Sequence, residues 1–208
     1  MPESAPLSVI YEDSAIVAVD KPAGLLSVPG RGEDKFDSVQ TRVAKRFPGA
    51  NAIHRLDMST SGLMLVAKHK VAERHYKRQF EARLVQKTYF AITHGRLWPH
   101  HGVIDLPLIG DWPNRPKQKV CYEHGKPAQT DYQVVCYQPE GTRVRLHPYT
   151  GRSHQLRVHL SALGYPILGD ELYDGNHPAR PRLLLHAAAL SLYTPEGELL
   201  NLYAPTPF

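Results

Sequence analysis

The sequence has few cysteines and no long apolar run, and both absences narrow the class of protein. Only Cys121 and Cys136 occur, and no second pair is present that would complete a zinc site. We therefore expect two reduced thiols in the core or in strands. No apolar run approaches the roughly 20 residues that a membrane helix requires, and residues 1–4 lack the features of a secretory signal. A cytoplasmic protein with no membrane partner is the expectation.

Repeats, low-complexity tracts and long linkers are also absent from the sequence.

Histidine is plentiful, with twelve residues, which raises the question of a metal site. However, His154 and His159 are five positions apart, and on a helix this spacing turns two side chains about 140° away from each other. We therefore predict no metal site.

Acidic side chains are outnumbered, with 20 Asp and Glu against 25 Lys and Arg and a net charge of +5. Two groups concentrate the positive charge: Lys68, Lys70, Arg74, Lys77, Arg78, Arg83 and Lys87, and then Arg115, Lys117, Lys119 and Lys126. Together these clusters suit the phosphates of a nucleic acid, although a solvated helix face is the default interpretation of either group alone.

Alternating apolar and polar residues predict most of the strands. The expected strands cover residues 9–11, 16–19, 88–93, 129–137, 142–147, 183–193 and 199–203. In the strand 142–147, Val144 and Leu146 face one way while Arg143, Arg145 and His147 face the other, which indicates a half-buried sheet.

Three helices are predicted from their apolar spacing. Asp37 is a suitable N-cap for a helix that reaches about Phe47. A second helix covers about residues 71–83 and buries Ala72, Tyr76 and Phe80. For the third, Ser153 is the candidate N-cap, and Gly164 ends the helix. This third helix is expected to turn three leucines inward: Leu156, Leu160 and Leu163.

Residues 54–62 read His-Arg-Leu-Asp-Met-Ser-Thr-Ser-Gly and lead directly into the apolar run Leu63–Ala67. Short polar residues favour turns, so we expect Asp57 on a loop whose downstream end is anchored by a buried strand. Loops held by a rigid scaffold commonly carry catalytic residues. The alternative is an ordinary Asp that caps a helical turn and pairs with Arg55.

Several segments match one family in the family's order. Residues 54–62 resemble the His-Arg-Leu-Asp-x-x-Thr-Ser-Gly signature of the RluA family of pseudouridine synthases. Residues 87–91 resemble its Lys-x-Tyr motif, and residues 151–159 resemble its Gly-Arg-x-His-Gln-x-Arg-x-His motif. Residues 182–187 supply the closing motif, and the resemblance covers nearly all of the chain from about Tyr11.

The resemblance implies an enzyme that isomerises uridine to pseudouridine in RNA. Asp57 is then the catalytic carboxylate, Arg157 is the cation that keeps it ionised, and Tyr89 stacks on the target base. Taken alone, Arg157 reads as a surface residue of an amphipathic helix and Tyr89 as a packed strand residue. The reaction changes no oxidation state, so no cofactor is expected.

Strands and helices interleave without regular β-α-β alternation, which favours an α+β fold with a mixed, largely antiparallel sheet. The resemblance implies the same class: the pseudouridine synthase fold, with a mostly antiparallel central sheet, flanking helices and a central catalytic cleft. We expect a single catalytic domain over residues 1–208. Because the fold begins near Ser8, no N-terminal S4 domain is expected.

A uridine stacked in RNA must be flipped out of its loop to reach such a site. Arg55 is expected to fill the gap that the base leaves, His54 to support the loop, and Leu184 or Leu185 to wall the base pocket. The residues expected to contact RNA are His54, Arg55, Arg115, Lys117, Lys119, Arg152 and Leu184. Residues 111–123 resemble a branch of the family that modifies both ribosomal and transfer RNA. We expect a monomer whose targets are a hairpin of large-subunit ribosomal RNA and the anticodon stem-loop of transfer RNA.

Two other classes of protein remain open at this stage. A non-catalytic RNA-binding module would use the same basic surface and would have no need for Asp57. A nucleoside-cleaving enzyme would also place a carboxylate at C1′, but such enzymes commonly use paired acids. No second acid is linked to Asp57 by a motif.

Overall fold

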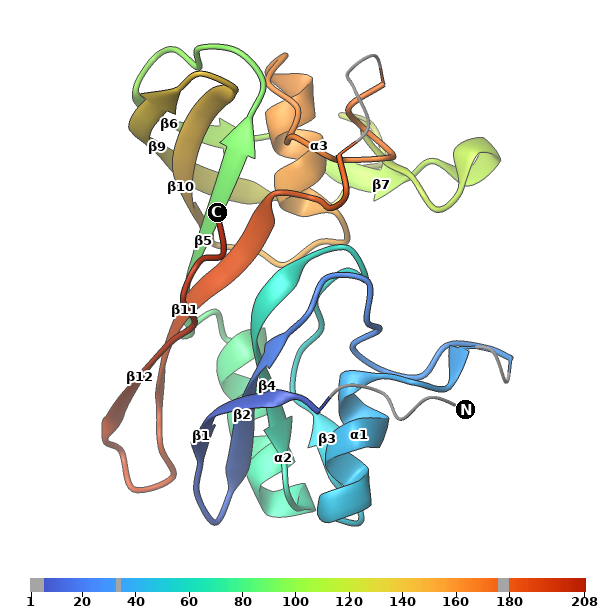
Figure 1. Cartoon of the computed structure of the whole chain (residues 1–208), viewed down its shortest axis with the longest axis vertical. Coiled ribbons are helices and arrows are strands. Elements are labelled where there is room, and N and C mark those ends of the chain that lie inside the picture. Colours follow the sequence, from blue (N-terminus) through green and yellow to red (C-terminus); the bar gives the residue numbers. More distant parts are fainter. Residues whose placement is uncertain (1–5, 33–34, 176–179) are drawn as a thin grey trace. The chain divides into compact units, whose positions relative to one another are not determined.

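The computed structural model describes residues 6–32, 35–175 and 180–208 and divides the chain into two compact units (Figure 1). The first unit comprises residues 1–86 and 187–207, and the second comprises residues 87–186 and Phe208. Each unit has a hydrophobic core of its own. The single domain expected over residues 1–208 stays a prediction.

The first unit contains strands in the order β1-β2-β4-β11-β12, with β3 beside β4. Their bounds are β1 Ser8–Glu12, β2 Ile16–Lys21, β3 Asn51–Ala52, β4 Ser61–Ala67, β11 Leu185–Tyr193 and β12 Leu199–Tyr203. The pairs β1–β2, β2–β4, β3–β4 and β11–β12 are antiparallel. The strands predicted at both ends of the chain are therefore confirmed.

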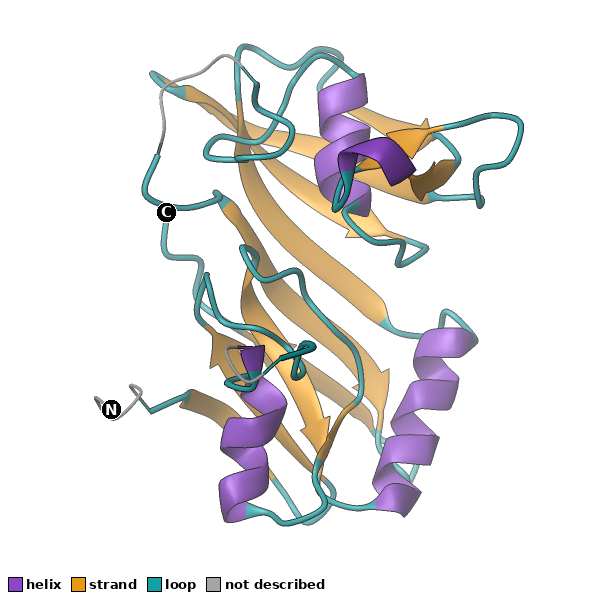
Figure 2. Ribbon diagram, turned by 90° about the vertical axis from the view of Figure 1, so that its right-hand side faces the viewer, coloured by secondary structure: helices purple, strands orange, loops and turns teal. Residues whose placement is uncertain are grey.

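Strand β4 is buried along its whole length. Leu63 and Leu65 share a core cluster with Ala72 and Tyr76 of α2 (Lys70–Glu81). On the opposite face of the sheet, Val17 and Val19 line a pocket together with Val43 of α1 (Val39–Arg46). Figure 2 shows the two helices on either side of these strands.

Helix α1 begins one residue later than predicted. Its N-cap is Ser38, whose hydroxyl accepts the Thr41 N–H at 3.2 Å, while the Thr41 hydroxyl accepts the Ser38 N–H at 2.9 Å. The predicted cap, Asp37, is wrong because its carboxylate binds the Arg42 guanidinium instead, at 2.8 and 2.6 Å. Two good capping residues stand side by side, and the reciprocal bonds of Ser38 decide between them.

The second unit contains antiparallel strands in the order β5-β10-β9-β6 and a separate hairpin of β7 and β8. Their bounds are β5 Gln86–Thr93, β6 His101–Asp105, β7 Leu108–Gly110, β8 Gln118–Val120, β9 Gln129–Gln138 and β10 Gly141–Pro148. Val144 and Leu146 are fully buried and Arg143, Arg145 and His147 are not, so the half-buried strand is confirmed.

Helix α3 (Gln155–Ala162) packs Leu156 and Leu160 into the core of the second unit. Its N-cap is His154 in a left-handed conformation rather than the predicted Ser153. Leu163, predicted to point inward, is 39% exposed because it lies at the C-cap, beyond the last full turn. Gly164 follows with a φ of +84°, the conformation that commonly ends a helix.

The architecture is α+β, with a mostly antiparallel sheet and few helices, as predicted. Cys136 lies on β9 and is exposed, and Cys121 lies just after β8 and is half-buried, so neither belongs to the core. Across the described residues, no helix is both long enough and apolar enough to cross a membrane.

Candidate active site

The loop that carries Asp57 is fastened to the segment after β2 by a buried hydroxyl. The Leu56 N–H donates to Ser27 Oγ at 2.9 Å, and the same hydroxyl donates to the Leu56 carbonyl at 2.7 Å. Both residues are buried. The backbone immediately before Asp57 is therefore held in one place.

A buried lysine fastens the other side of the same loop. Lys21 is completely buried, and its ammonium group donates to the carbonyls of Leu25 at 2.7 Å, Pro22 at 3.0 Å and Met58 at 3.0 Å. A buried charge is tolerated only with such partners. The sequence shows Lys21 at the start of a Lys-Pro-Ala-Gly step that resembles a loop of the family and equally fits a simple turn. No role in holding Asp57 was predicted for it.

Asp57 itself is half-buried and lies outside any helix or strand, as predicted for a catalytic loop. The Thr60 N–H donates to the Asp57 carbonyl at 3.1 Å and closes the turn that leads into β4. Arg55, two residues earlier, is exposed. The alternative, in which Asp57 caps this turn and pairs with Arg55, stays a prediction.

His54 supports this loop from the side of α2. Its ring stacks on Phe80 with a centroid distance of 4.7 Å and an interplanar angle of 19°. Its Nε2 accepts the Leu65 N–H at 3.1 Å, which places the ring proton on Nδ1 if the ring is neutral. These contacts agree with the supporting role expected for His54, and its contact with RNA stays a prediction.

Tyr89 and Leu184 belong to the second unit and are both half-buried. Tyr89 lies on β5 opposite Leu146 of β10 and packs against the core cluster of that unit. Leu184 stands between Leu183 and Leu185, which are 2% and 3% exposed. Because Leu185 is almost completely buried, Leu184 is the better candidate for a wall that a base can touch.

Arg157 is not a surface residue, although it lies on a helix. Its side chain is 5% exposed and forms two bonds to the carboxylate of Asp170, from Nε at 2.7 Å and from Nη2 at 2.7 Å. The Asp170 side chain is 0% exposed. Two parallel bonds fix the plane of the guanidinium group, so the alternative of an ordinary solvated arginine is wrong.

Asp170 is a second residue that sequence reasoning missed. Besides Arg157, its Oδ1 accepts the backbone N–H groups of Leu172 at 3.0 Å and Tyr173 at 3.2 Å. A carboxylate that accepts four such bonds is held rigidly. Its only sequence signal is the Gly169-Asp170 step, which reads as an ordinary turn.

The cationic residues predicted to bind RNA lie in the second unit, on and near the β7–β8 hairpin. Arg115 and Lys119 are exposed and Lys117 is half-buried. Lys119 pairs with Asp111 at 3.2 Å, and the pKa of Asp111 is lowered by its hydrogen bond from Asn114 and by Lys119. Arg152 is half-buried, and its Nε donates to the Pro127 carbonyl at 3.1 Å. Their contacts with RNA stay predictions.

Three lysines of the earlier basic group, from Lys68 to Lys87, form local ion pairs. Lys68 pairs with Glu12, and both Lys70 and Lys77 pair with Glu73 at 2.8 and 2.7 Å. These two lysines lower the pKa of Glu73 through their hydrogen bonds. Arg74, Arg78 and Arg83 are exposed. Contact of this group with phosphates stays a prediction.

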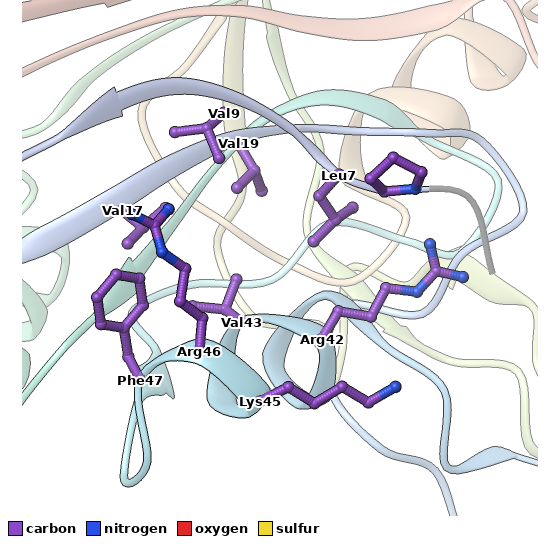
Figure 3. A pocket seen from close by; sticks show the side chains of 10 residues that line it. Leu7, Val9, Val17, Val19, Arg42, Val43, Lys45, Arg46 and Phe47 are labelled. Carbon is purple, nitrogen blue, oxygen red and sulfur yellow. The ribbon is translucent and has the colours of Figure 1, made fainter. Parts of the chain in front are cut away.

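A pocket of about 330 Å³ opens in the first unit between α1 and the strands β1 and β2 (Figure 3). Valines and Phe47 line it together with Arg42, Lys45 and Arg46. None of the residues predicted to form the active site lines this pocket. Arg42 and Arg46 are also committed to carboxylates, those of Asp37 and Glu12. It is therefore not the candidate active site.

Within the described part of the chain, no group of three or more His, Cys, Asp and Glu side chains is arranged to hold a metal ion. His154 bonds through Nδ1 to the Tyr173 hydroxyl at 2.7 Å. His159 is buried between the Thr130 hydroxyl and the Leu106 carbonyl, each 3.0 Å from a ring nitrogen. Burial lowers the pKa of His159, partly offset by the bond to Leu106.

Comparison with known proteins shows the family to which this chain belongs. Residues 15–162 match the family model described as RNA pseudouridylate synthase. The chain belongs to the RNA pseudouridine synthases of the RluA family, and it is an isomerase that converts uridine to pseudouridine.

Particular relatives are similar over nearly the whole chain. The dual-specificity RNA pseudouridine synthase RluA of Escherichia coli K12 is 55% identical over 211 residues, which cover 100% of this chain and 96% of the relative. The protein of the same description from Yersinia pestis is 58% identical over 193 residues, covering 90% and 93%. The solved structure of human RNA pseudouridylate synthase domain containing 1 has a TM-score of 0.83 at 32% identity and covers 100% of this chain and 87% of that one.

Proposed function

We propose that Asp57 is the carboxylate that acts on the ribose of the target uridine, with Arg157 as its charge partner and Tyr89 against the base. One observation carries this proposal: Asp57, which lies within the family's signature, is on a loop that Ser27 and Lys21 hold in place. The separately fixed guanidinium of Arg157 supports it. A cation beside a carboxylate favours its ionised form.

The reaction breaks the C1′–N1 bond of uridine, turns the uracil and joins C1′ to C5. The proton on C5 is then lost and N1 gains one, so the product is an isomer of the substrate. An ionised Asp57 serves either as a nucleophile at C1′ or as a base toward the 2′ hydrogen. Tyr89 stacks on the uracil, and its hydroxyl is a candidate to relay the C5 proton.

The target uridine must leave its stack, which costs a few kcal/mol. Arg55 is exposed two residues from Asp57 and occupies the gap left by the extruded base. Leu184 walls the base pocket opposite Tyr89. Arg115, Lys117, Lys119 and Arg152 contact the backbone of the RNA, and His54 holds the loop.

By similarity to relatives described as dual-specificity enzymes, the substrates are stem-loops of ribosomal and transfer RNA. The protein acts as a monomer in the cytoplasm and needs neither cofactor nor metal. Mapping pseudouridines in cells with and without this protein tests the target set. Two sites that disappear together, one in each RNA, are expected, and the loss of a site in only one RNA would overturn dual specificity.

Tritium at uridine C5 distinguishes the enzyme from its rivals. The wild-type protein is expected to release tritium from a labelled RNA hairpin while the RNA chain keeps all of its bases. A non-catalytic binding module would release none, and a glycosidase would liberate free uracil. Either result would refute the proposed reaction.

A further inference from the structure

The β7–β8 hairpin of the second unit exposes an indole at its tip. The short helix η2 (Trp112–Asn114) lies between the two strands, and Trp112 is 74% exposed. In Figure 1 the loop after β7 projects away from α3 of the same unit. The Arg115 guanidinium group lies over one face of the indole ring. A large aromatic ring with a cation on one face is a typical binding element for single-stranded nucleic acid.

The tip is preorganised by hydrogen bonds of its own. The Asp111 N–H donates to the Lys117 carbonyl at 2.9 Å, and the Asn114 N–H donates to the Asp111 carbonyl at 2.9 Å. The Asn114 side chain also donates to Asp111 Oδ2 at 2.8 Å. Where the tip joins β8, the Gln118 N–H donates to the hydroxyl of Tyr173 at 2.7 Å. A platform that is already ordered loses little entropy when a ligand binds.

The charge around the indole suits a polyanion. Four cationic side chains belong to the hairpin and the turn after it, against two acidic ones: Arg115, Lys117, Lys119 and Lys126, and Asp111 and Glu123. Asp111 is engaged by Lys119 and Asn114. Arg115, over the ring, and Lys117, two residues further along the chain, offer positive charge to a phosphate backbone.

We propose that Trp112 is a stacking platform for an unpaired base of the substrate RNA, a base other than the target uridine. Arg115 and Lys117 hold the phosphates beside that base. This inference rests on the proposed function, because it takes the substrate to be an RNA stem-loop. Every base has a π-face, so stacking tolerates different sequences. Such a platform suits an enzyme that accepts loops from two RNAs.

The chain offers a direct reporter, since it contains only two tryptophans. Trp98 is 68% exposed, close to the 74% of Trp112, but its nearest aromatic contact is the edge of the His100 ring. Trp98→Phe leaves Trp112 as the single indole, and Trp112→Phe leaves Trp98 as the matched control. Each protein is titrated with an RNA hairpin that has an unpaired loop and with an RNA duplex of equal length.

The hairpin is expected to quench the emission of the Trp98→Phe protein at least twofold, because a base stacks on Trp112. The Trp112→Phe protein is expected to change little, and the duplex is expected to quench weakly. Equal responses of the two indoles to the hairpin, or no response of Trp112, would overturn the proposal.

Turnover gives a second and independent measurement. Trp112→Ala is expected to raise KM for the hairpin roughly 5- to 100-fold, the usual effect of losing one stacked base. Trp112→Tyr is expected to recover most of this loss, and Trp98→Ala to behave as wild type. If KM is unchanged in Trp112→Ala, the platform is refuted.

The two proposals fail in distinguishable ways. If the wild-type protein releases no tritium but Trp112 is still quenched by the hairpin, the proposed reaction fails and the platform stands. If tritium release is normal and Trp112 does not respond, only the platform fails.

Discussion

Arg157 and Asp170 show how strongly the role of an ion pair depends on its burial. Asp37 and Arg42 make the same two-bond arrangement, at 2.8 and 2.6 Å, but the Asp37 side chain is 54% exposed. The Asp170 side chain is 0% exposed. Surface pairs contribute little to stability, whereas removing one member of a buried pair leaves an uncompensated charge.

Asp170→Asn is therefore expected to lower the free energy of unfolding by roughly 3–5 kcal/mol. Asp37→Asn, the matched control, is expected to lower it by less than about 1 kcal/mol. Urea unfolding of the two variants at neutral pH measures both effects. Equal losses would show that the buried pair does not hold Arg157 in the way described.

A second prediction for a single residue concerns the buried Lys21. Lys21→Met leaves three carbonyl oxygens without their ammonium donor, which is expected to lower the free energy of unfolding by roughly 1–3 kcal/mol. Tritium release from RNA is expected to fall roughly tenfold or more, because the loop that carries Asp57 is no longer held in register.

The exposed Lys45 provides the control for Lys21. Lys45→Met is expected to leave both unfolding and turnover close to wild type. Wild-type turnover in Lys21→Met would mean that the lysine supports the fold and not the placement of Asp57.

Strand β4 depends on a close approach of two backbones at its start. Gly62 has a φ of +113°, and a Cβ there would lie 2.3 Å from the carbonyl oxygen of Ala187 in β11. Gly62→Ala is expected to lower the free energy of unfolding by more than about 3 kcal/mol, from backbone strain together with the clash.

Gly49 has a positive φ of +87° but nothing within 4 Å of its added Cβ. Gly49→Ala is therefore expected to cost only about 1–2 kcal/mol. Urea denaturation of the two variants compares the clash with strain alone. A Gly62→Ala protein no less stable than Gly49→Ala would contradict the close packing of β4 against β11.

Helix α3 carries a histidine that makes stability depend on pH. Burial lowers the pKa of His159 below its usual value in the unfolded chain, about 6.5. The unfolded state therefore binds a proton more readily, so stability is complete above about pH 6.5 and falls as the pH drops below it. Unfolding measured between pH 7.5 and pH 5, in wild type and in His159→Gln, is expected to show a shallower fall in the variant. Parallel pH profiles would contradict this.

The sequence predicted elements well where the pattern was long and poorly where it was short. The alternation in β9 and β10 and the buried stripe of α2 were enough to find them. Strands β7 and β8 have three residues each and were missed, because so few positions cannot show a period. The start of α3 was misplaced because His154 adopts a left-handed conformation, which no capping rule for Ser153 foresees.

At the candidate active site, the residues within the family motifs could be predicted, but the buried residues that hold them in place could not. Asp57, Tyr89 and Arg157 followed from the resemblance, and Asp57 lies on the expected loop. Lys21 and Asp170 were missed because their roles come from buried contacts with carbonyl oxygens and with a guanidinium group. The local sequence at each residue indicates only a turn, and the contacts with Met58 and Arg157 join segments that are distant in the sequence.

At the scale of the whole molecule, the proposed chemistry draws on both compact units. Asp57 belongs to the first unit, and Tyr89 and Arg157 belong to the second. Each group is held rigidly within its own unit, Asp57 by the contacts of its loop and Arg157 by Asp170. That these groups act in one reaction is part of the proposal, and the resemblance of their motifs to one family supports it.

The measurement that tests this account most directly compares Asp57→Asn with Asp131→Asn, a half-buried acid on β9 outside the proposed site. Both variants are incubated with an RNA hairpin labelled with tritium at uridine C5, and RNA binding is measured alongside. Asp57→Asn is expected to bind the hairpin and release no tritium above background, while Asp131→Asn releases it as wild type does. Tritium release by Asp57→Asn at the wild-type rate would contradict the central role given to this carboxylate.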